Sequence, residues 1–115
     1  MNAPFLLFDD GDISAFASLD ALSAYVESPD LSRYVATDNT GQFVKLTSRS
    51  DAAKGTGLFI SVEKVSATAQ NDRMHESEFK ERLRTFLRRF LIDTHGTETI
   101  EALVARVIAR IGYTR

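Results

Sequence analysis

Three aspartates around one glycine are the densest group of potentially reactive side chains in the chain. Asp9, Asp10 and Asp12 flank Gly11 between two apolar runs. A calcium loop of the EF-hand type needs acids at alternate positions and a distant glutamate, and this stretch has neither. Carboxylate pairs act as general acids and bases in clefts that shift their pKa values, whereas a tight turn usually lies in water. The residues therefore favour a solvated turn over a metal or catalytic site.

The same residues have the composition of a β-hairpin turn. Asp10-Gly11 is typical of a type I′ turn, in which both central residues have positive φ. Counting outward from this turn places Asp9 opposite Asp12, and like charges so placed cost about 0.2–1 kcal/mol. A lysine or arginine from a partner would remove this repulsion. The turn is thus also a candidate docking point for a basic protein surface.

The other reactive side chains do not form a recognisable site in the sequence. His75 and His95 lie twenty residues apart, at opposite ends of a predicted helix about 30 Å long, too far apart to share a ligand. No serine has the Gly-x-Ser-x-Gly context of a nucleophile elbow. Two glycines lie close to Lys54, but without the spacing of a phosphate loop. We therefore predict no catalytic residue, no metal site and no cofactor.

Charge is divided unevenly along the chain. Residues 1–50 contain seven acids and three bases, whereas residues 51–115 contain nine acids and eleven bases. The acidic first half argues against nucleic-acid binding there. The basic run Lys80–Phe90 has its aromatic and leucine side chains on one helical face, and Glu78 and Arg82 are spaced as an i,i+4 ion pair. A solvated helix face explains this run, and we predict no direct contact with nucleic acid.

Alternating apolar residues indicate strands, and apolar residues three and four positions apart indicate helices. The expected elements are a hairpin over 5–16, a helix from a Ser18 cap to residue 28, strands over 33–38 and 42–47, a loop over 48–57 and a strand over 58–67. A helix capped by Asn71 or Asp72 then runs to about Ile92, and Gly96 and Thr97 separate it from a last helix over 100–111. This order predicts an α+β fold with a mostly antiparallel sheet of about five strands, covered by helices that include a C-terminal pair.

The totals fit a single globular domain. A chain of 115 residues, 43% hydrophobic and 26% charged, can build one core, and we expect one domain over residues 1–115. Cysteine is absent, which excludes disulfides, thiolate metal sites and a cysteine nucleophile and fits a reducing compartment. No apolar run approaches the roughly 20 residues that span a bilayer, and no basic segment opens the chain. We therefore expect a cytoplasmic protein without membrane contact.

Residues 5–47 contain an ordered series of motifs: a strand, an acidic-glycine turn, a strand with an aromatic residue, a capped helix ending in Tyr-x-Glu, and an Asp-x-x-Gly hairpin. The positions concerned are Asp10-Gly11, Phe16, Ser18-Leu19, Tyr25, Glu27, Asp38 and Gly41. In this order the segment resembles small bacterial immunity proteins of contact-dependent growth inhibition and polymorphic-toxin systems. The C-terminal helices carry no such resemblance.

The resemblance implies a protein that is not an enzyme and that neutralises a cognate toxin by direct binding. Many such toxins are nucleases, which are basic because they bind phosphates. An acidic inhibitor surface competes for that charge and speeds association. The residues expected to bind the toxin are acids of the first half of the chain: Asp9, Asp10, Asp12, Asp20, Glu27, Asp30 and Asp38.

Two alternatives of other classes stay open. One is a small α+β ligand-binding or enzymatic domain with a cleft between sheet and helices. The other is a homodimeric structural subunit that buries the apolar face of residues 100–112 against a second copy. The sequence does not decide between a monomer and a homodimer.

Overall fold

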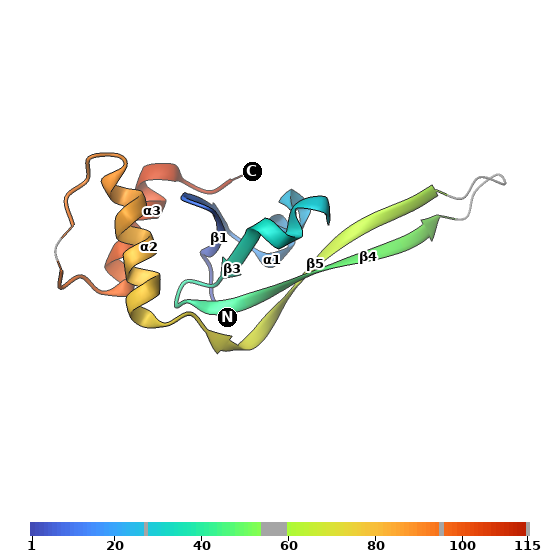
Figure 1. The fold of residues 1–115 in the computed structure, drawn as a ribbon, viewed down its shortest axis with the longest axis horizontal. Coiled ribbons are helices and arrows are strands. Elements are labelled where there is room, and N and C mark those ends of the chain that lie inside the picture. Colours follow the sequence, from blue (N-terminus) through green and yellow to red (C-terminus); the bar gives the residue numbers. More distant parts are fainter. Residues whose placement is uncertain (27, 54–59, 95, 115) are drawn as a thin grey trace.

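The computed structural model describes residues 1–26, 28–53, 60–94 and 96–114, without the side chains of residues 28–30, 49–53 and 60–64. Its elements, shown in Figure 1, are β1 (Phe5–Asp9), β2 (Asp12–Phe16), α1 (Leu19–Tyr25), the 3-10 helix η1 (Ser28–Arg33), β3 (Tyr34–Thr37), β4 (Gln42–Ala53), β5 (Ile60–Arg73), α2 (Glu76–Arg88) and α3 (Ile100–Ile111). The predicted order of strands and helices is confirmed.

The five strands form one antiparallel sheet with the order β2-β1-β3-β4-β5. The predicted α+β class is therefore confirmed, and β2 and β5 are the edge strands. The first hairpin also has the predicted register, since Phe5 lies opposite Phe16 and Asp9 opposite Asp12.

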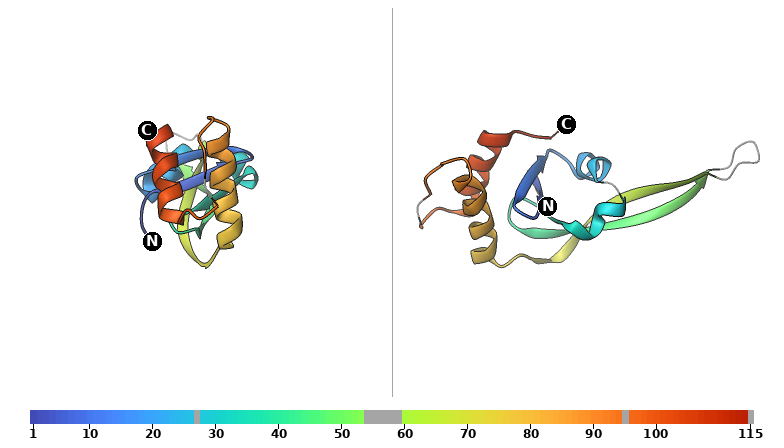
Figure 2. Two further views of the ribbon diagram at one scale, coloured as in Figure 1. Left: turned by 90° about the vertical axis from the view of Figure 1, so that its left-hand side faces the viewer. Right: turned by 45° about the horizontal axis from the view of Figure 1, so that its top comes forward.

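Both faces of β1 are buried over Phe5–Phe8, because successive side chains of a strand point to opposite sides and these four residues are all apolar. Leu6 and Phe8 belong to the core formed with α2 and α3. Phe5 and Leu7 belong to a second core, which includes Leu22 of α1. Figure 2 shows α2 and α3 side by side at one end of the molecule and α1 on the other side of β1. Two helical layers thus sandwich the short strands that carry the Asp9–Asp12 turn.

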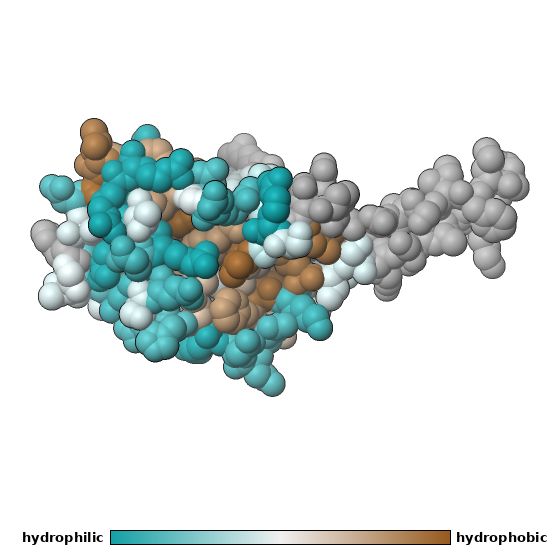
Figure 3. All heavy atoms as spheres, viewed as in Figure 1, coloured by the Kyte–Doolittle hydropathy of each residue, from teal (hydrophilic) through white to brown (hydrophobic). Residues whose placement is uncertain are grey.

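Beyond residue 44 the sheet narrows to a ribbon of two strands. β3 meets β4 at Ala36–Val44 and Thr37–Phe43, and from Lys45 to Ala53 β4 pairs with β5. Figure 1 shows this ribbon leaving the body of the protein. Near its root, Val35 and Phe43 are only partly buried, and Figure 3 shows apolar surface between α2 and the ribbon.

The ribbon corrects two predicted boundaries. The predicted loop is wrong for residues 48–53, which continue β4, and the predicted end of the third strand at residue 67 is wrong because β5 continues to Arg73. Half of residues 48–53 and 68–73 are Ala, Asn or Asp, which have low strand propensity, but pairing across the ladder holds most of them in the strands. The remainder of the predicted loop and the start of that strand lie outside the described residues.

The ends of α2 also differ from the prediction. Asn71 and Asp72 lie in β5 rather than capping a helix, and His75 occupies the N-cap position of α2. The helix ends at Arg88, short of the predicted Ile92, and Leu91 has a φ of 58° that no helix tolerates.

The other helix caps follow the expected chemistry. The Ser18 hydroxyl accepts a hydrogen bond from the amide of Ala21 at 3.0 Å, as predicted for the start of α1. At the start of α3 the cap is Thr99 instead of the predicted Thr97, and its hydroxyl accepts from the Ala102 amide at 3.1 Å. Gly96 is not a helix cap, and His95 lies outside the described residues.

In the described part of the chain, no helix combines the length and apolar character needed to cross a bilayer.

Candidate protein-binding site

The β1–β2 turn is tight, but its glycine is explained by space rather than by φ. Asp10 has a φ of 55°, as a type I′ turn requires, whereas Gly11 is not among the residues with positive φ. The predicted turn type is therefore right for Asp10 and wrong for Gly11. A Cβ on Gly11 would lie 3.3 Å from Nη1 of Arg89. The small residue leaves room for an arginine that comes from the end of α2.

Two arginines hold the facing carboxylates of Asp9 and Asp12. Arg33 Nη2 lies 2.9 Å from Asp9 Oδ2, and Arg89 Nη1 lies 2.9 Å from Asp12 Oδ1. Arg89 Nη1 also donates to the carbonyl of Gly11 at 2.7 Å. The prediction of an unrelieved repulsion is therefore wrong, because the chain supplies both cations itself. Each pair is exposed enough to contribute only about 0.2–1 kcal/mol, so their main effect is to fix the geometry of the turn.

The structure places two of the other predicted acids at exposed positions and leaves two others undescribed. Asp10 is exposed at the tip, and Asp20 is exposed in the first turn of α1. Asp30 lies in η1, but its side chain, like all of Glu27, lies outside the described residues. The described part of the predicted acidic surface therefore consists of the turn and the start of α1.

Asp38 is buried and stabilises a turn instead of lying on the surface. Its side chain is buried, with 2% of the residue exposed. Oδ1 accepts hydrogen bonds from the Thr40 amide at 2.8 Å, the Thr40 hydroxyl at 2.8 Å and the Gln42 amide at 3.0 Å. The carboxylate closes the β3–β4 turn, so Asp38 cannot reach a partner and is left out of the candidate surface.

Exposed aromatic residues flank the turn, and these were not singled out as partner-binding residues from the sequence. A pocket of about 300 Å³ beside β2 is lined by Asp9, Asp12, Tyr25, Tyr34 and Phe90, among others. Tyr25, from α1, is 47% exposed, and Phe90, which follows α2, is 36% exposed. Tyr25 rests on Phe16, with ring centroids 5.2 Å apart. Exposed aromatic rings beside arginines are typical of protein-binding hot spots.

A second pocket, of about 250 Å³, lies on the other side of the turn against α2. Asp10, Glu78, Glu81 and Arg82 line it, and Arg82 stacks over the ring of Phe8 at 5.5 Å. The tip of the turn is therefore accessible on the side that faces α2 as well as beside β2.

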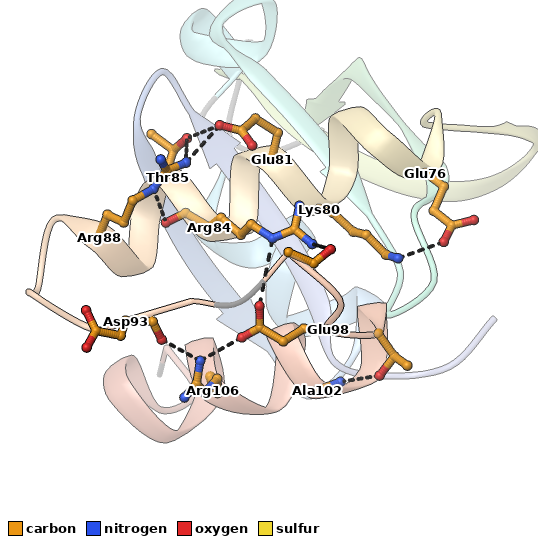
Figure 4. Close-up of polar contacts among 12 residues, drawn as sticks. Glu76, Lys80, Glu81, Arg84, Thr85, Arg88, Asp93, Glu98, Ala102 and Arg106 are labelled. Carbon is orange, nitrogen blue, oxygen red and sulfur yellow. Dashed lines mark hydrogen bonds and ion pairs between the residues drawn. The ribbon is translucent and has the colours of Figure 1, made fainter.

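The basic run on α2 is largely neutralised within the chain. Lys80 pairs with Glu76 at 3.0 Å and Arg88 with Glu81 at 2.8 Å, as Figure 4 shows. The Lys80 ammonium, through its hydrogen bond and its charge, holds the pKa of Glu76 below its ordinary value. These contacts agree with the prediction of a solvated, ion-paired helix face.

A third hollow, of about 540 Å³, runs along α3. Val104, Ala105, Ile108 and Ala109 line it together with Tyr113 and other residues. The main apolar face of α3, which includes Leu103 and Val107, is buried inside the chain. The predicted dimer contact through this helix would therefore have to use its small outer residues.

Among the residues that the structure describes, no three or more of His, Asp and Glu are grouped so that they could hold a metal ion. Comparisons of the chain with protein-family models, with curated proteins and with solved structures gave no match.

Proposed function

We propose that the protein is a toxin-neutralising binding protein that contacts its partner through the β1–β2 turn and the aromatic residues beside it. One observation carries this proposal. The flanking carboxylates of the turn are fixed by Arg33 and Arg89, while Tyr25 and Phe90 remain exposed next to them. A rigid turn with exposed aromatic neighbours loses little conformational entropy on binding.

The electrostatic attraction of a basic partner comes from the tip of the turn rather than from the facing carboxylates of Asp9 and Asp12. Asp9 and Asp12 are already neutralised by arginines, whereas Asp10 forms no ion pair within the described part of the chain. Its exposed carboxylate gives the tip an acidic character suited to a basic toxin domain, and the exposed Asp20 of α1 is a further acid of the predicted set. Charges of this kind mainly accelerate association.

The test uses the polypeptide encoded by the gene adjacent to that of this protein as the probe. The two proteins should form a complex in titration calorimetry, and co-expression should restore growth to cells that produce the polypeptide alone. Tyr25→Ala should weaken the complex by about tenfold or more, as expected for an aromatic hot spot. Asp10→Lys should lower the association rate more than it raises the dissociation rate.

Tyr113→Ala is the matched control, because Tyr113 is also 47% exposed but lines the hollow along α3. It should not weaken the complex. No complex with the adjacent polypeptide, or equal losses for the two tyrosine variants, would contradict the proposal.

A further inference from the structure

The outer edge of β2 presents main-chain groups that the sheet does not use. In the register of the hairpin, Asp12, Ser14 and Phe16 exchange hydrogen bonds with β1, because a two-residue turn is flanked by a hydrogen-bonded pair. Successive residues of a strand direct their N–H and C=O groups to opposite sides. The main-chain groups of Ile13 and Ala15 therefore point away from β1, along the free edge of the sheet.

Part of this edge is already bonded to another segment of the chain itself. Gly112, with a φ of 67°, ends α3 and redirects the chain. Two residues later the Thr114 amide donates to the carbonyl of Ala15 at 2.7 Å. Figure 2 shows the C-terminal end of the chain returning toward the short strands. This C-terminal tail thus makes one main-chain hydrogen bond to the outer edge of β2, of the kind that a paired strand would make.

The tail leaves the half of the edge next to the turn open. Ile13 and Ser14 line the 300 Å³ pocket described above, and Tyr25 and Phe90 lie on either side of it. Because Asp9 and Asp12 are neutralised by Arg33 and Arg89, the pocket suits a large apolar side chain better than a charged one. A strand lying on β2 would place alternate side chains in such a pocket.

We propose that the edge of β2 between the turn and the tail docks an extended segment of a partner protein. The main chain of that segment pairs with the N–H and C=O of Ile13, one large apolar side chain fills the pocket between Tyr25 and Phe90, and the segment displaces the tail from Ala15 when it extends that far. The identification of this partner as the toxin rests on the proposed function. The inference that β2 binds an extended segment of another polypeptide does not depend on the proposed function.

The first experiment uses the tail sequence itself as the probe. Thr114→Pro removes the main-chain N–H that donates to the carbonyl of Ala15. Thr114→Val keeps this N–H and is the matched control. The acetylated peptide Ala-Arg-Ile-Gly-Tyr-Thr-Arg, residues 109–115, is then titrated into each isotope-labelled protein and followed by NMR. In the Pro variant it should shift the amides of residues 13–16 and slow hydrogen exchange at Ile13.

The wild type and the Val variant should bind the peptide about tenfold more weakly, because their tethered tail competes at an effective concentration in the millimolar range. A peptide N-methylated at its threonine should not bind the Pro variant. Equal shifts with the N-methylated peptide, or no shift at residues 13–16 with several millimolar peptide, would overturn strand docking.

The second experiment uses the polypeptide from the adjacent gene. In its complex, exchange of the Ile13 amide should slow, while that of Ser14, already paired with β1, changes little. A complex without slower exchange at Ile13 overturns the docking mode and leaves the proposed function intact. Peptide docking without a complex supports the strand site and contradicts the proposed function.

Discussion

At the scale of single residues, Leu91 combines an exposed apolar side chain with a backbone that is unfavourable for it. It is 93% exposed and has a φ of 58°. A left-handed conformation costs an L-residue about 1–2 kcal/mol, and glycine avoids that cost. We therefore expect Leu91→Gly to raise the free energy of unfolding by about 1 kcal/mol, measured by urea denaturation.

The control for this prediction lies two residues away in the same loop. Asp93 is exposed and is not among the residues with positive φ, so Asp93→Gly should lower stability by a few tenths to about 1 kcal/mol through chain entropy. Destabilisation by both substitutions would mean that Leu91 makes a contact that outweighs its strain.

Two glycines of the β-turns are required for different reasons. At Gly41, with a φ of 94°, an added Cβ would lie 3.0 Å from the ring of Phe79, which is fully buried. Gly41→Ala should therefore cost about 2–4 kcal/mol, the sum of backbone strain and overpacking. At Gly11 the added Cβ would meet the far end of the half-exposed Arg89 at 3.3 Å, which can move aside. Gly11→Ala should cost less than about 1 kcal/mol in thermal or urea unfolding, and equal losses would refute this distinction.

The register of the first hairpin could be predicted from its residues, but the partners of its carboxylates could not. Asp9 lies opposite Asp12 because the turn between them consists of two residues, which is a local property of the sequence. Arg33 and Arg89 are 24 and 77 positions away from the aspartates they bind. Nothing in the spacing of the chain indicates that η1 and the end of α2 converge on this turn. Local chemistry therefore predicted the register of the turn, and tertiary packing determined its electrostatics.

At the scale of elements, the loop between α2 and α3 depends on one largely buried carboxylate. Glu98 has a side chain only 10% exposed, with Arg106 Nη1 at 2.8 Å and Arg84 Nε at 3.9 Å, as Figure 4 shows. The shorter contact is a hydrogen bond and the longer one is a Coulombic contact alone. Arg106 also donates to the carbonyl of Asp93 at 2.7 Å, so the loop is tied to α3 at two points.

Removal of this carboxylate should destabilise the protein far more than removal of an exposed one. Glu98→Ala leaves two arginines partly buried without their anion and should cost about 2–4 kcal/mol. Glu81→Ala removes an ion pair of the same 2.8 Å length, but its carboxylate is 61% exposed, and it should cost less than about 1 kcal/mol. Urea denaturation of both variants at neutral pH measures the difference, and similar losses would show that burial does not govern the Glu98 contacts.

At the scale of the whole molecule, the sequence predicted the α+β class because hydrophobic periodicity reports which faces are covered. It failed at the ribbon, where β4 beyond Thr47 and β5 have few large apolar residues and their pairing depends on main-chain hydrogen bonds. Local composition alone predicts a loop for residues 48–53. The true extent of these strands is set by the partner strand across the ladder, which no local pattern contains.

The ribbon should also be the least stable part of the sheet. Beyond Thr47 each of its strands has one neighbour, and two strands alone are marginally stable in water. Native-state hydrogen exchange should therefore show the amides that join residues 48–53 to 60–65 opening at least about 2 kcal/mol more easily than those joining β1 to β3. Equal protection throughout the sheet at low protein concentration would contradict this expectation. Protection of the ribbon that increases with protein concentration would instead mean that a second copy covers it, because only association makes local stability depend on concentration.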